Sequence, residues 1–344
     1  MSYLSNLLTL ASGGRNLRPR MVVYYLTTHC NFNCAYCEDF GARRNPNLPA
    51  HLPLADAKNL LRKLRSGLDS LWLTGGEPLL VPHLPELLRF ARRELGFRSL
   101  SLITNGSLLP ARPEILPLLD RLVISLDSLD PAACAALNMP PAYAEKMPEL
   151  LRQTASQQKT LGFRLILNAV ITPASLADAS LDALISFCAE NSIRIAFSPQ
   201  AVNNWPRYEL LTSPAYRAFI QKLIRLKRSG APILGSYAYL KTLLRLEPYD
   251  CYPTLIPRIL PGGELEYPCR PIAKAGGEAG GREINLLDFP NWQAAWAAAR
   301  QRYGEAPSAC TSCFQQCYVE PSLMQARPLD YWREPAELAT FAPG

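Results

Sequence analysis

Short apolar runs alternate with segments of helical periodicity through the first two hundred residues of this 344-residue chain. Six runs rich in Val, Ile and Leu are the predicted strands, at 21–26, 68–73, 100–103, 121–126, 163–171 and 193–197. Residues with helical spacing lie between them, at 55–66, 84–95, 148–161 and 181–191. Strand–helix alternation joins parallel strands by right-handed crossovers, so the pattern predicts an α/β fold. Periodicity alone does not separate a barrel from an open sheet.

Three cysteines follow the first predicted strand at C-x3-C-x2-C spacing: Cys30, Cys34 and Cys37. Thiolates at such spacing can bind one iron–sulfur cluster, and three ligands on a four-iron cube leave one iron open to another molecule. A structural zinc site is the alternative. Zinc usually takes four ligands, and the nearest fourth candidate, His29, directly abuts Cys30. The spacing therefore favours an iron–sulfur cluster with an open iron.

This motif, with the aromatic Tyr36 before its last cysteine, resembles the signature of the radical S-adenosylmethionine (SAM) superfamily. A second match, Thr74-Gly75-Gly76-Glu77-Pro78, follows the second predicted strand. The resemblance covers about residues 20–200 and implies a partial (β/α)6 barrel over 21–205. It also implies a [4Fe–4S] cluster whose open iron binds the amino and carboxylate groups of SAM. Tyr36 would then lie near the adenine, and Gly75, Gly76 and Glu77 would meet the methionyl amino group.

Polar residues also stand where later strands end, and the carboxyl ends of parallel strands are where such folds bind ligands. The family resemblance makes Ser125, Asn168 and Asp127 candidates for contact with SAM. Asn105 is a further cofactor-binding candidate by its position after the third strand. Each of the four has an alternative interpretation as a turn or capping residue.

Charge and hydropathy narrow the function classes. The net charge is +7, but the basic residues are scattered, which does not indicate a nucleic-acid surface. No apolar run approaches the length of a membrane span, and no signal peptide is evident, so a reducing cytoplasm is expected. Residues 1–20 form a predicted helical segment. Its stripe of Leu4, Leu7 and Leu8 is expected to pack on the domain's own core, with a membrane-surface helix as the alternative.

The middle region, 206–250, is a predicted helical linker with apolar stripes at 213–227 and 237–246. Cys134 and Cys188 lie in helical patterns and are expected to be buried as small apolar residues.

A second set of cysteines lies in the last hundred residues. Cys251 and Cys269 flank a predicted β-hairpin with a Gly-Gly turn, and Cys310, Cys313 and Cys317 follow. A zinc site is again the alternative. The arrangement resembles the auxiliary-cluster extension of radical SAM enzymes, of the twitch or SPASM type. This implies a small α+β domain, a β-hairpin plus helices, over 251–344, with a second [4Fe–4S] cluster. The predicted ligands are Cys251, Cys269, Cys310 and Cys313, while Cys317 either replaces Cys313 or remains a free thiol.

By resemblance, such a chain cleaves SAM to a 5′-deoxyadenosyl radical that abstracts hydrogen from an organic small molecule. We expect net oxidation or bond formation assisted by the second cluster, and a flavodoxin- or ferredoxin-type electron donor. Only 29 residues precede Cys30, too few for a separate peptide-recognition domain, which favours a small molecule over a peptide. The alternatives are a maturase of a ribosomal peptide presented by a partner protein, a non-catalytic iron–sulfur electron carrier, and a zinc-binding nucleic-acid module. The candidates for a general base are Tyr24, Arg194, Gln200 and Tyr252.

Overall fold

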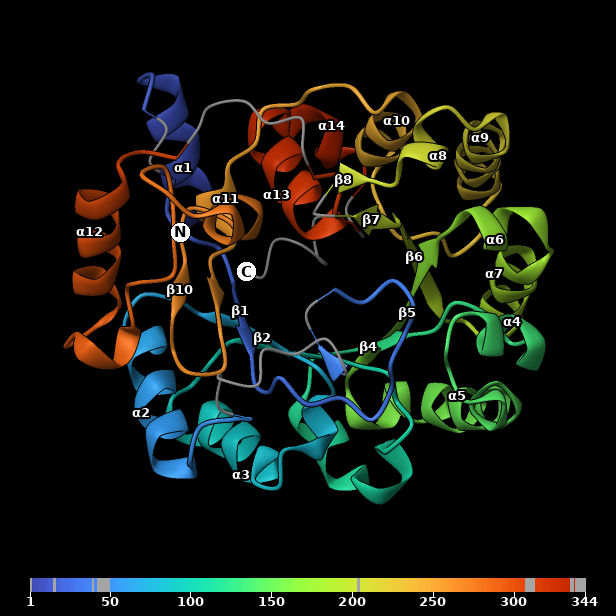
Figure 1. Cartoon of the computed structure of the whole chain (residues 1–344), viewed down its shortest axis with the longest axis horizontal. Coiled ribbons are helices and arrows are strands. Elements are labelled where there is room, and N and C mark those ends of the chain that lie inside the picture. Colours follow the sequence, from blue (N-terminus) through green and yellow to red (C-terminus); the bar gives the residue numbers. More distant parts are fainter. Residues whose placement is uncertain are drawn as a thin grey trace.

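The computed structural model describes residues 2–14, 17–38, 40–41, 50–202, 205–306, 313–334 and 337. Its centre is an eight-stranded sheet with the order β10-β9-β1-β2-β3-β4-β5-β6. The neighbours from β9 to β6 are all parallel, and only β10 is antiparallel to its partner. The strands curve around a central space and helices surround them on the outside (Figure 1). The predicted α/β fold with parallel strands is therefore confirmed.

The six predicted strands are all present. They are β1 Val22–Tyr25, β2 Ser70–Thr74, β3 Ser99–Thr104, β4 Arg121–Ser125, β5 Arg164–Ile171 and β6 Arg194–Pro199. Alternate residues of each strand point to opposite sides. On β1, Val22 and Tyr24 pack in the large core beneath the outer helices, whereas Val23 and Tyr25 face the space inside the barrel. Both faces of these strands are apolar, as expected for a parallel sheet covered on both sides.

The outer layer connects successive strands. It comprises α2 Leu54–Arg65, η2 Pro78–Leu80, α3 Leu84–Arg89 with its π-helical continuation η3 Phe90–Glu94, η4 Leu109–Ala111, η5 Pro113–Leu118, α4 Pro131–Ala136, α5 Pro141–Leu161, α6 Pro173–Ala177 and α7 Ser180–Glu190. The sequence predicted the start of α5 at Pro148, but the helix begins seven residues earlier and Pro148 lies inside it. The buried face formed by Tyr143, Ala144 and Met147 packs against the core, and this packing overrides the tendency of proline to end a helix.

Beyond β6, a two-stranded ribbon and a set of helices lead back towards β1. They are β7 Ala201–Val202, β8 Trp205–Pro206, α8 Tyr208–Leu211, α9 Pro214–Arg228, α10 Tyr237–Arg245, η6 Pro253–Leu255, β9 Arg258–Ile259, β10 Leu265–Glu266, α11 Arg270–Ala275, η7 Leu286–Asp288, α12 Trp292–Tyr303, α13 Gln316–Ala326 and α14 Pro328–Trp332. The predicted hairpin is present as β9–β10. The sequence did not indicate that β9 pairs with β1, which makes the hairpin an extension of the barrel sheet.

The N-terminal helix α1, Ser2–Ala11, differs from its prediction. Leu4 and Leu8 are 68% and 73% exposed, so the expected packing of this stripe on the core is wrong. The buried residue of α1 is Asn6, whose side chain donates to the carbonyl of Arg18 and accepts from its amide. Two hydrogen bonds between the Asn6 side chain and the backbone of Arg18 thus hold this helix, where apolar packing was expected. By contrast, Cys134 and Cys188 are fully buried, as predicted.

Candidate active site

The loop that carries Cys30, Cys34 and Cys37 begins where β1 ends. Local bonds shape it: the Cys37 amide donates to the Cys34 carbonyl at 3.0 Å, and the Phe32 amide donates to Cys30 Sγ at 3.3 Å. The three cysteines are only half-buried. Burial, reinforced by the nearby Asp127, raises the pKa of the Cys34 thiol to about 12, so a bound metal would be needed to hold it as a thiolate.

The Gly75-Gly76-Glu77 turn is fastened directly to this loop. The amide of Gly76 donates to the Thr27 carbonyl at 2.8 Å, and the amide of Glu77 donates to the His29 carbonyl at 2.7 Å. A Cβ atom on Gly76 would lie 2.0 Å from the His29 oxygen, so no larger residue fits there. The two motifs that the sequence analysis singled out therefore form one unit at the carboxyl ends of β1 and β2.

The Glu77 carboxylate is fully buried and bonded within the protein. It accepts hydrogen bonds from the amide of Leu79 at 2.9 Å, the hydroxyl of Thr104 at 2.6 Å and the amide of Asn105 at 2.8 Å. The side chain thus ties the turn after β2 to the end of β3. Among the three residues of the turn, Gly75 is the one that lines the cavity described below.

Tyr36 is held by Asp127, at the end of β4. The Tyr36 hydroxyl donates to Asp127 Oδ2 at 2.5 Å, and the amide of Val170 on β5 donates to Oδ1 at 2.7 Å. Burial raises the pKa of Asp127 to about 6. Asp127 therefore acts on the site by fixing the tyrosine, a role that differs from the capping role named as its alternative.

Asn105, Ser125 and Asn168 lie at neighbouring strand ends, as predicted. Asn105 Nδ2 donates to Asn31 Oδ1 at 2.9 Å, which links the end of β3 to the cysteine loop. Ser125 of β4 pairs in register with Asn168 of β5. Of the two residues, Asn168 lines the cavity described below.

Tyr143 on α5 is a positioning residue that the sequence analysis missed. Its hydroxyl lies 2.6 Å from the Asn105 carbonyl and 2.9 Å from that of Ser125. Its ring contacts Phe32 of the cysteine loop, edge to face, at a centroid distance of 4.9 Å. One buried tyrosine thereby joins the loop to the ends of β3 and β4. The only signal in the sequence would have been an aromatic residue near the start of a helix, which is common in cores.

A cavity of about 400 Å³ lies inside the barrel. Its lining includes Tyr36, Cys37 and Gly75 from the first two motifs and Cys317 from the second cysteine set. Its wall is largely apolar, and the polar side chains that line it include Asn168, Arg258, Arg270, Gln315 and Gln316. None of Tyr24, Arg194, Gln200 and Tyr252 lines this cavity, but Gln200 lines a second pocket that also borders Tyr36 and Cys37. Tyr24, for example, lies on the opposite face of β1 in the core.

The second cysteine set is assembled from distant parts of the chain. Cys269, after the hairpin, packs with Cys313 and Tyr318, and Cys317 lies against this cluster. Tyr252, the residue after Cys251, is hydrogen-bonded to α13, because its amide donates to Ser322 Oγ at 2.9 Å. Cys310 lies outside the described residues. In the described part of the chain, no three Cys, His, Asp or Glu side chains stand close enough to bind a single metal ion.

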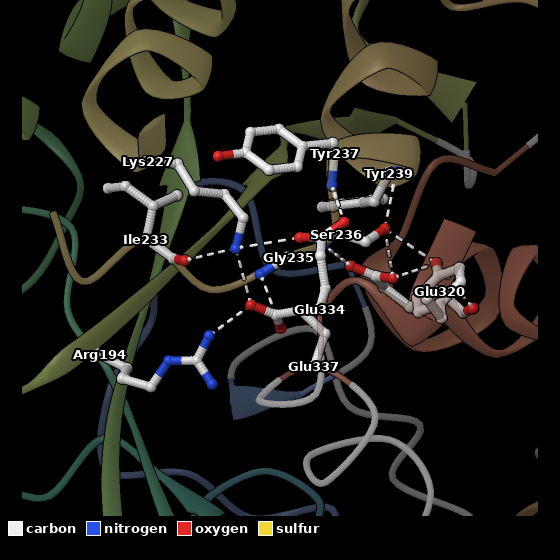
Figure 2. A network of polar contacts seen from close by, with 11 residues as sticks. Arg194, Lys227, Ile233, Gly235, Ser236, Tyr237, Tyr239, Glu320, Glu334 and Glu337 are labelled. Atoms are coloured by element: carbon white, nitrogen blue, oxygen red, sulfur yellow. Dashed lines mark hydrogen bonds and ion pairs between the residues drawn. The ribbon is translucent and has the colours of Figure 1, made fainter. Parts of the chain in front are cut away.

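Helix α13 presents Gln316 and Cys317 to the cavity, and a buried polar network anchors it (Figure 2). Glu320 Oε1 accepts from the Ser236 amide at 2.6 Å, and Oε2 lies 2.9 Å from Ser236 Oγ and 2.5 Å from the Tyr331 hydroxyl. Burial and the nearby Glu337 raise the pKa of Glu320 to about 7.

The same network reaches the barrel itself. Glu337, which is 1% exposed, pairs with Lys227 at 2.8 Å and with Arg194, which begins β6 (Figure 2). The Tyr237 amide donates to Glu334 at 2.9 Å. These contacts fix the C-terminal helices to the outer end of β6 and to α9 and α10.

Residues 24–157 match the sequence model of the family described as the radical SAM superfamily. The matched part of the chain contains both the cysteine loop and the Gly75-Gly76-Glu77 turn. Among curated relatives, it is 32% identical to the GTP 3′,8-cyclase of Mycobacterium marinum over 217 residues, which is 60% of this chain and 58% of that protein. It is 34% identical to GTP 3′,8-cyclase 1 of Pseudomonas aeruginosa over 176 residues, 50% of this chain and 51% of that protein. The chain thus spans less than two thirds of these relatives.

Solved structures agree with the α/β fold of the chain. The structure titled "Native anSMEcpe with bound AdoMet" superposes with a TM-score of 0.58 over 81% of this chain and 80% of that chain, at 15% identity. At this identity the likeness shows the fold alone. In the part of the chain that the structure describes, no helix has the length and apolar character that crossing a bilayer requires.

Proposed function

We propose that this protein is a radical SAM enzyme that oxidises an organic small molecule, or forms a bond in it, with the help of a second iron–sulfur cluster. The observation that carries the proposal is the cavity whose lining includes both Cys37 and Cys317. A carrier of electrons needs no ligand-sized cavity that borders two sets of cysteines, so this feature favours catalysis over the non-catalytic alternative.

The residues of the barrel have separate tasks in this proposal. Cys30, Cys34 and Cys37 would hold a [4Fe–4S] cluster, which supplies the electron that cleaves SAM to methionine and a 5′-deoxyadenosyl radical. The backbone of Gly75 and the side chain of Asn168 would bind SAM, while Asp127 holds Tyr36 beside it. The apolar wall, with Ile103, Val123 and Ile166, would keep water away from a radical that abstracts hydrogen from any nearby C–H bond.

The second cysteine set decides the net reaction. Hydrogen abstraction converts the radical to 5′-deoxyadenosine and leaves a radical on the substrate. Loss of one further electron and one proton completes a two-electron oxidation. Cys251, Cys269, Cys310 and Cys313, or Cys317 in place of Cys313, would hold a second [4Fe–4S] cluster that accepts this electron. A flavodoxin- or ferredoxin-type protein as electron donor and a cytoplasmic location belong to the same proposal.

A second candidate reaction is a redox-neutral cyclisation of a nucleotide. The similarity to GTP 3′,8-cyclases over 60% of the chain favours it. The two candidates differ in outcome: oxidation changes the redox state of the substrate by two electrons, whereas cyclisation of GTP does not. Peptide maturation, in which a partner protein presents a ribosomal peptide, is the remaining alternative.

The first test is reductive cleavage of SAM by anaerobically reconstituted protein. The wild type should release 5′-deoxyadenosine and contain about eight iron atoms, for two [4Fe–4S] clusters. The C30A/C34A/C37A variant should release none and retain about four iron atoms. Cys188→Ala, at a fully buried cysteine of α7, is the matched control and should behave as the wild type.

Cleavage retained in the triple variant would refute the assignment of the first cysteine set. About four iron atoms in the wild type and none in the triple variant would refute the assignment of a second cluster. Redox-neutral chemistry would then be favoured. Incubation with GTP separates the candidates further, because formation of a cyclised nucleotide would replace oxidation as the proposed reaction.

A further inference from the structure

A second pocket, of about 780 Å³, adjoins the cavity inside the barrel. Four residues line both spaces, which places their junction between the cysteine loop and the start of β7: Tyr36, Cys37, Glu38 and Ala201. The inner cavity, of about 400 Å³, lies near the lower end of the range for sites that bind a single small molecule. In the proposed function it holds SAM together with the reacting part of the substrate. The rest of a substrate therefore has room only in the outer pocket.

One wall of the outer pocket is formed by the β7–β8 ribbon and the start of α8. Val202 and Trp205 are opposite each other in the ribbon, which places their side chains on the same face. Tyr208 is the first residue of α8. The ribbon is held closed at its base, because the Arg207 amide donates to the Gln200 carbonyl at 2.7 Å. The backbone thus supports three apolar side chains beside the pocket.

These three side chains concentrate exposed apolar surface at one place. Val202, Trp205 and Tyr208 are 46%, 48% and 74% exposed, and all three line the pocket. Of the eight large hydrophobic side chains that are exposed in the described part of the chain, no other lines it. Exposed apolar groups that gather around a concave surface mark a binding site. Because Trp and Tyr offer flat faces on which other rings stack, the wall suits a ligand with an aromatic ring.

The charged side chains of the wall offset one another. Arg207 is paired with Glu209 at 2.8 Å, and Glu38 is paired with Lys274 of α11 at 3.3 Å. Beyond Arg207, Glu209 and Glu38, no Lys, Arg, His, Asp or Glu lines the described wall. A charged ligand group would have to compete with these pairs, so the pocket favours an uncharged group.

We infer that the outer pocket is a substrate-binding subsite for an uncharged aromatic ring, which packs against Trp205 and Tyr208. The inference rests on the proposed function for its statement that the ligand is the substrate. The substrate then spans both spaces. Its ring lies outside the barrel against the ribbon, and the part that loses hydrogen lies in the cavity lined by Gly75 and Asn168. The ribbon thereby selects the substrate without contact with the reacting carbon.

Binding of 2-naphthol, an aromatic alcohol that is uncharged at neutral pH, to the reconstituted full-length protein tests this inference. Equilibrium dialysis gives the Kd, with and without saturating SAM. The wild type should bind about one 2-naphthol per chain with a Kd of about 1 mM or tighter, in the range of a small ligand held by a few contacts. SAM should not weaken this binding, because the cofactor occupies the inner cavity.

Two variants locate the bound ring. Trp205→Ala and Tyr208→Ala each remove one aromatic face and should weaken binding of 2-naphthol about tenfold. Both side chains are exposed, so neither change should unfold the protein. Trp332→Ala is the matched control. This tryptophan of α14 is 77% exposed and does not line the pocket, so its loss should leave the Kd as in the wild type.

The inference is overturned if the wild type does not bind 2-naphthol, if Trp205→Ala or Tyr208→Ala binds it as tightly as the wild type, or if Trp332→Ala weakens binding equally. Competition by SAM would also overturn it, because the pocket would then serve the cofactor. A third contrary result is slower reduction of Trp205→Ala by a reduced flavodoxin with unchanged binding of 2-naphthol, since the ribbon would then be a docking surface for the electron donor.

The failure of the proposed function is separate. A wild type that binds 2-naphthol through both rings but never cleaves SAM would keep the aromatic subsite and refute radical catalysis.

Discussion

The two cysteine regions of the protein are held in place by different kinds of interaction. The first region is the loop with Cys30, Cys34 and Cys37, and the second is the C-terminal region with Cys269, Cys313 and Cys317. Backbone hydrogen bonds from the Gly76 and Glu77 turn fix the first, over fewer than fifty residues of chain. Buried side-chain contacts fix the second, and they join residues as far apart as Arg194 and Glu337. The first arrangement depends on close approach of backbones, so it tolerates no added side chain. The second depends on charge balance, so it responds to pH and to loss of single carboxylates.

The largest effect is expected for Gly76→Ala. Its Cβ would lie 2.0 Å from the His29 oxygen, so the turn and the cysteine loop must separate. We expect a loss of about 3 kcal/mol in the free energy of unfolding and at least about a tenfold loss of SAM cleavage, as for overpacking at a rigid contact. Denaturant unfolding and release of 5′-deoxyadenosine measure the two. Gly162→Ala is the control: φ there is +78° with open space around it, so only about 1 kcal/mol of backbone strain is expected and cleavage should persist.

The next effect is expected for Glu320→Ala in the second region. The change leaves the Ser236 amide and the Tyr331 hydroxyl without their acceptor in a buried site. We expect a loss of about 2–3 kcal/mol in the free energy of unfolding. SAM cleavage per folded molecule should remain close to that of the wild type, because the first region keeps its contacts. A parallel loss of cleavage in Glu320→Ala would show that the two regions are not independent.

We also expect the stability of the protein to depend on pH through the Glu320 carboxyl group, with a smaller effect than that of Glu320→Ala. Its pKa is raised to about 7 by burial and by Glu337, above its ordinary value of 4.5. The folded state therefore holds a proton that the unfolded chain releases, so the stability due to Glu320 is present at low pH and is lost as pH rises towards 7. In Glu320→Gln this contribution should vanish. A plot of the Tm difference between the two proteins against pH should change between about pH 4.5 and 7 and be flat above. A flat difference throughout would place the pKa of Glu320 at its ordinary value.

The smallest effect is expected at an ion pair that joins the two regions. Lys274 on α11 lies 3.3 Å from Glu38 of the cysteine loop, and the two side chains are 31% and 26% exposed. Lys274→Ala should cost less than about 1 kcal/mol, as for partly exposed pairs, and the loss should shrink further at high salt. Urea unfolding at low and high KCl measures it. A loss of several kcal/mol would mean that this contact, and not the sheet pairing of β1 with β9, joins the regions.

The two regions also differ in how far the sequence predicted them. The six strands, the Cys30-Cys34-Cys37 loop and the Gly75-Gly76-Glu77 turn were predicted because each is a local pattern of period, spacing or turn chemistry. The parallel order then followed from the alternation of strands and helices. The predicted N-terminal stripe was wrong because helical spacing of Leu4 and Leu8 says nothing of which face is covered.

Only the tertiary structure decided the rest. The pairing of β9 with β1 places Arg258 beside the cavity, although 233 residues separate it from Tyr25. The packing of helices on the sheet likewise brings Glu337 to Arg194. It also brings Tyr143 to Asn105. Spacing along the chain predicts contacts between residues that are close in sequence. A hydrogen bond between buried groups that are far apart in sequence depends on the whole fold. The sequence by itself therefore determined the fold class and the cysteine loop, and folding determined which side chains line the cavity.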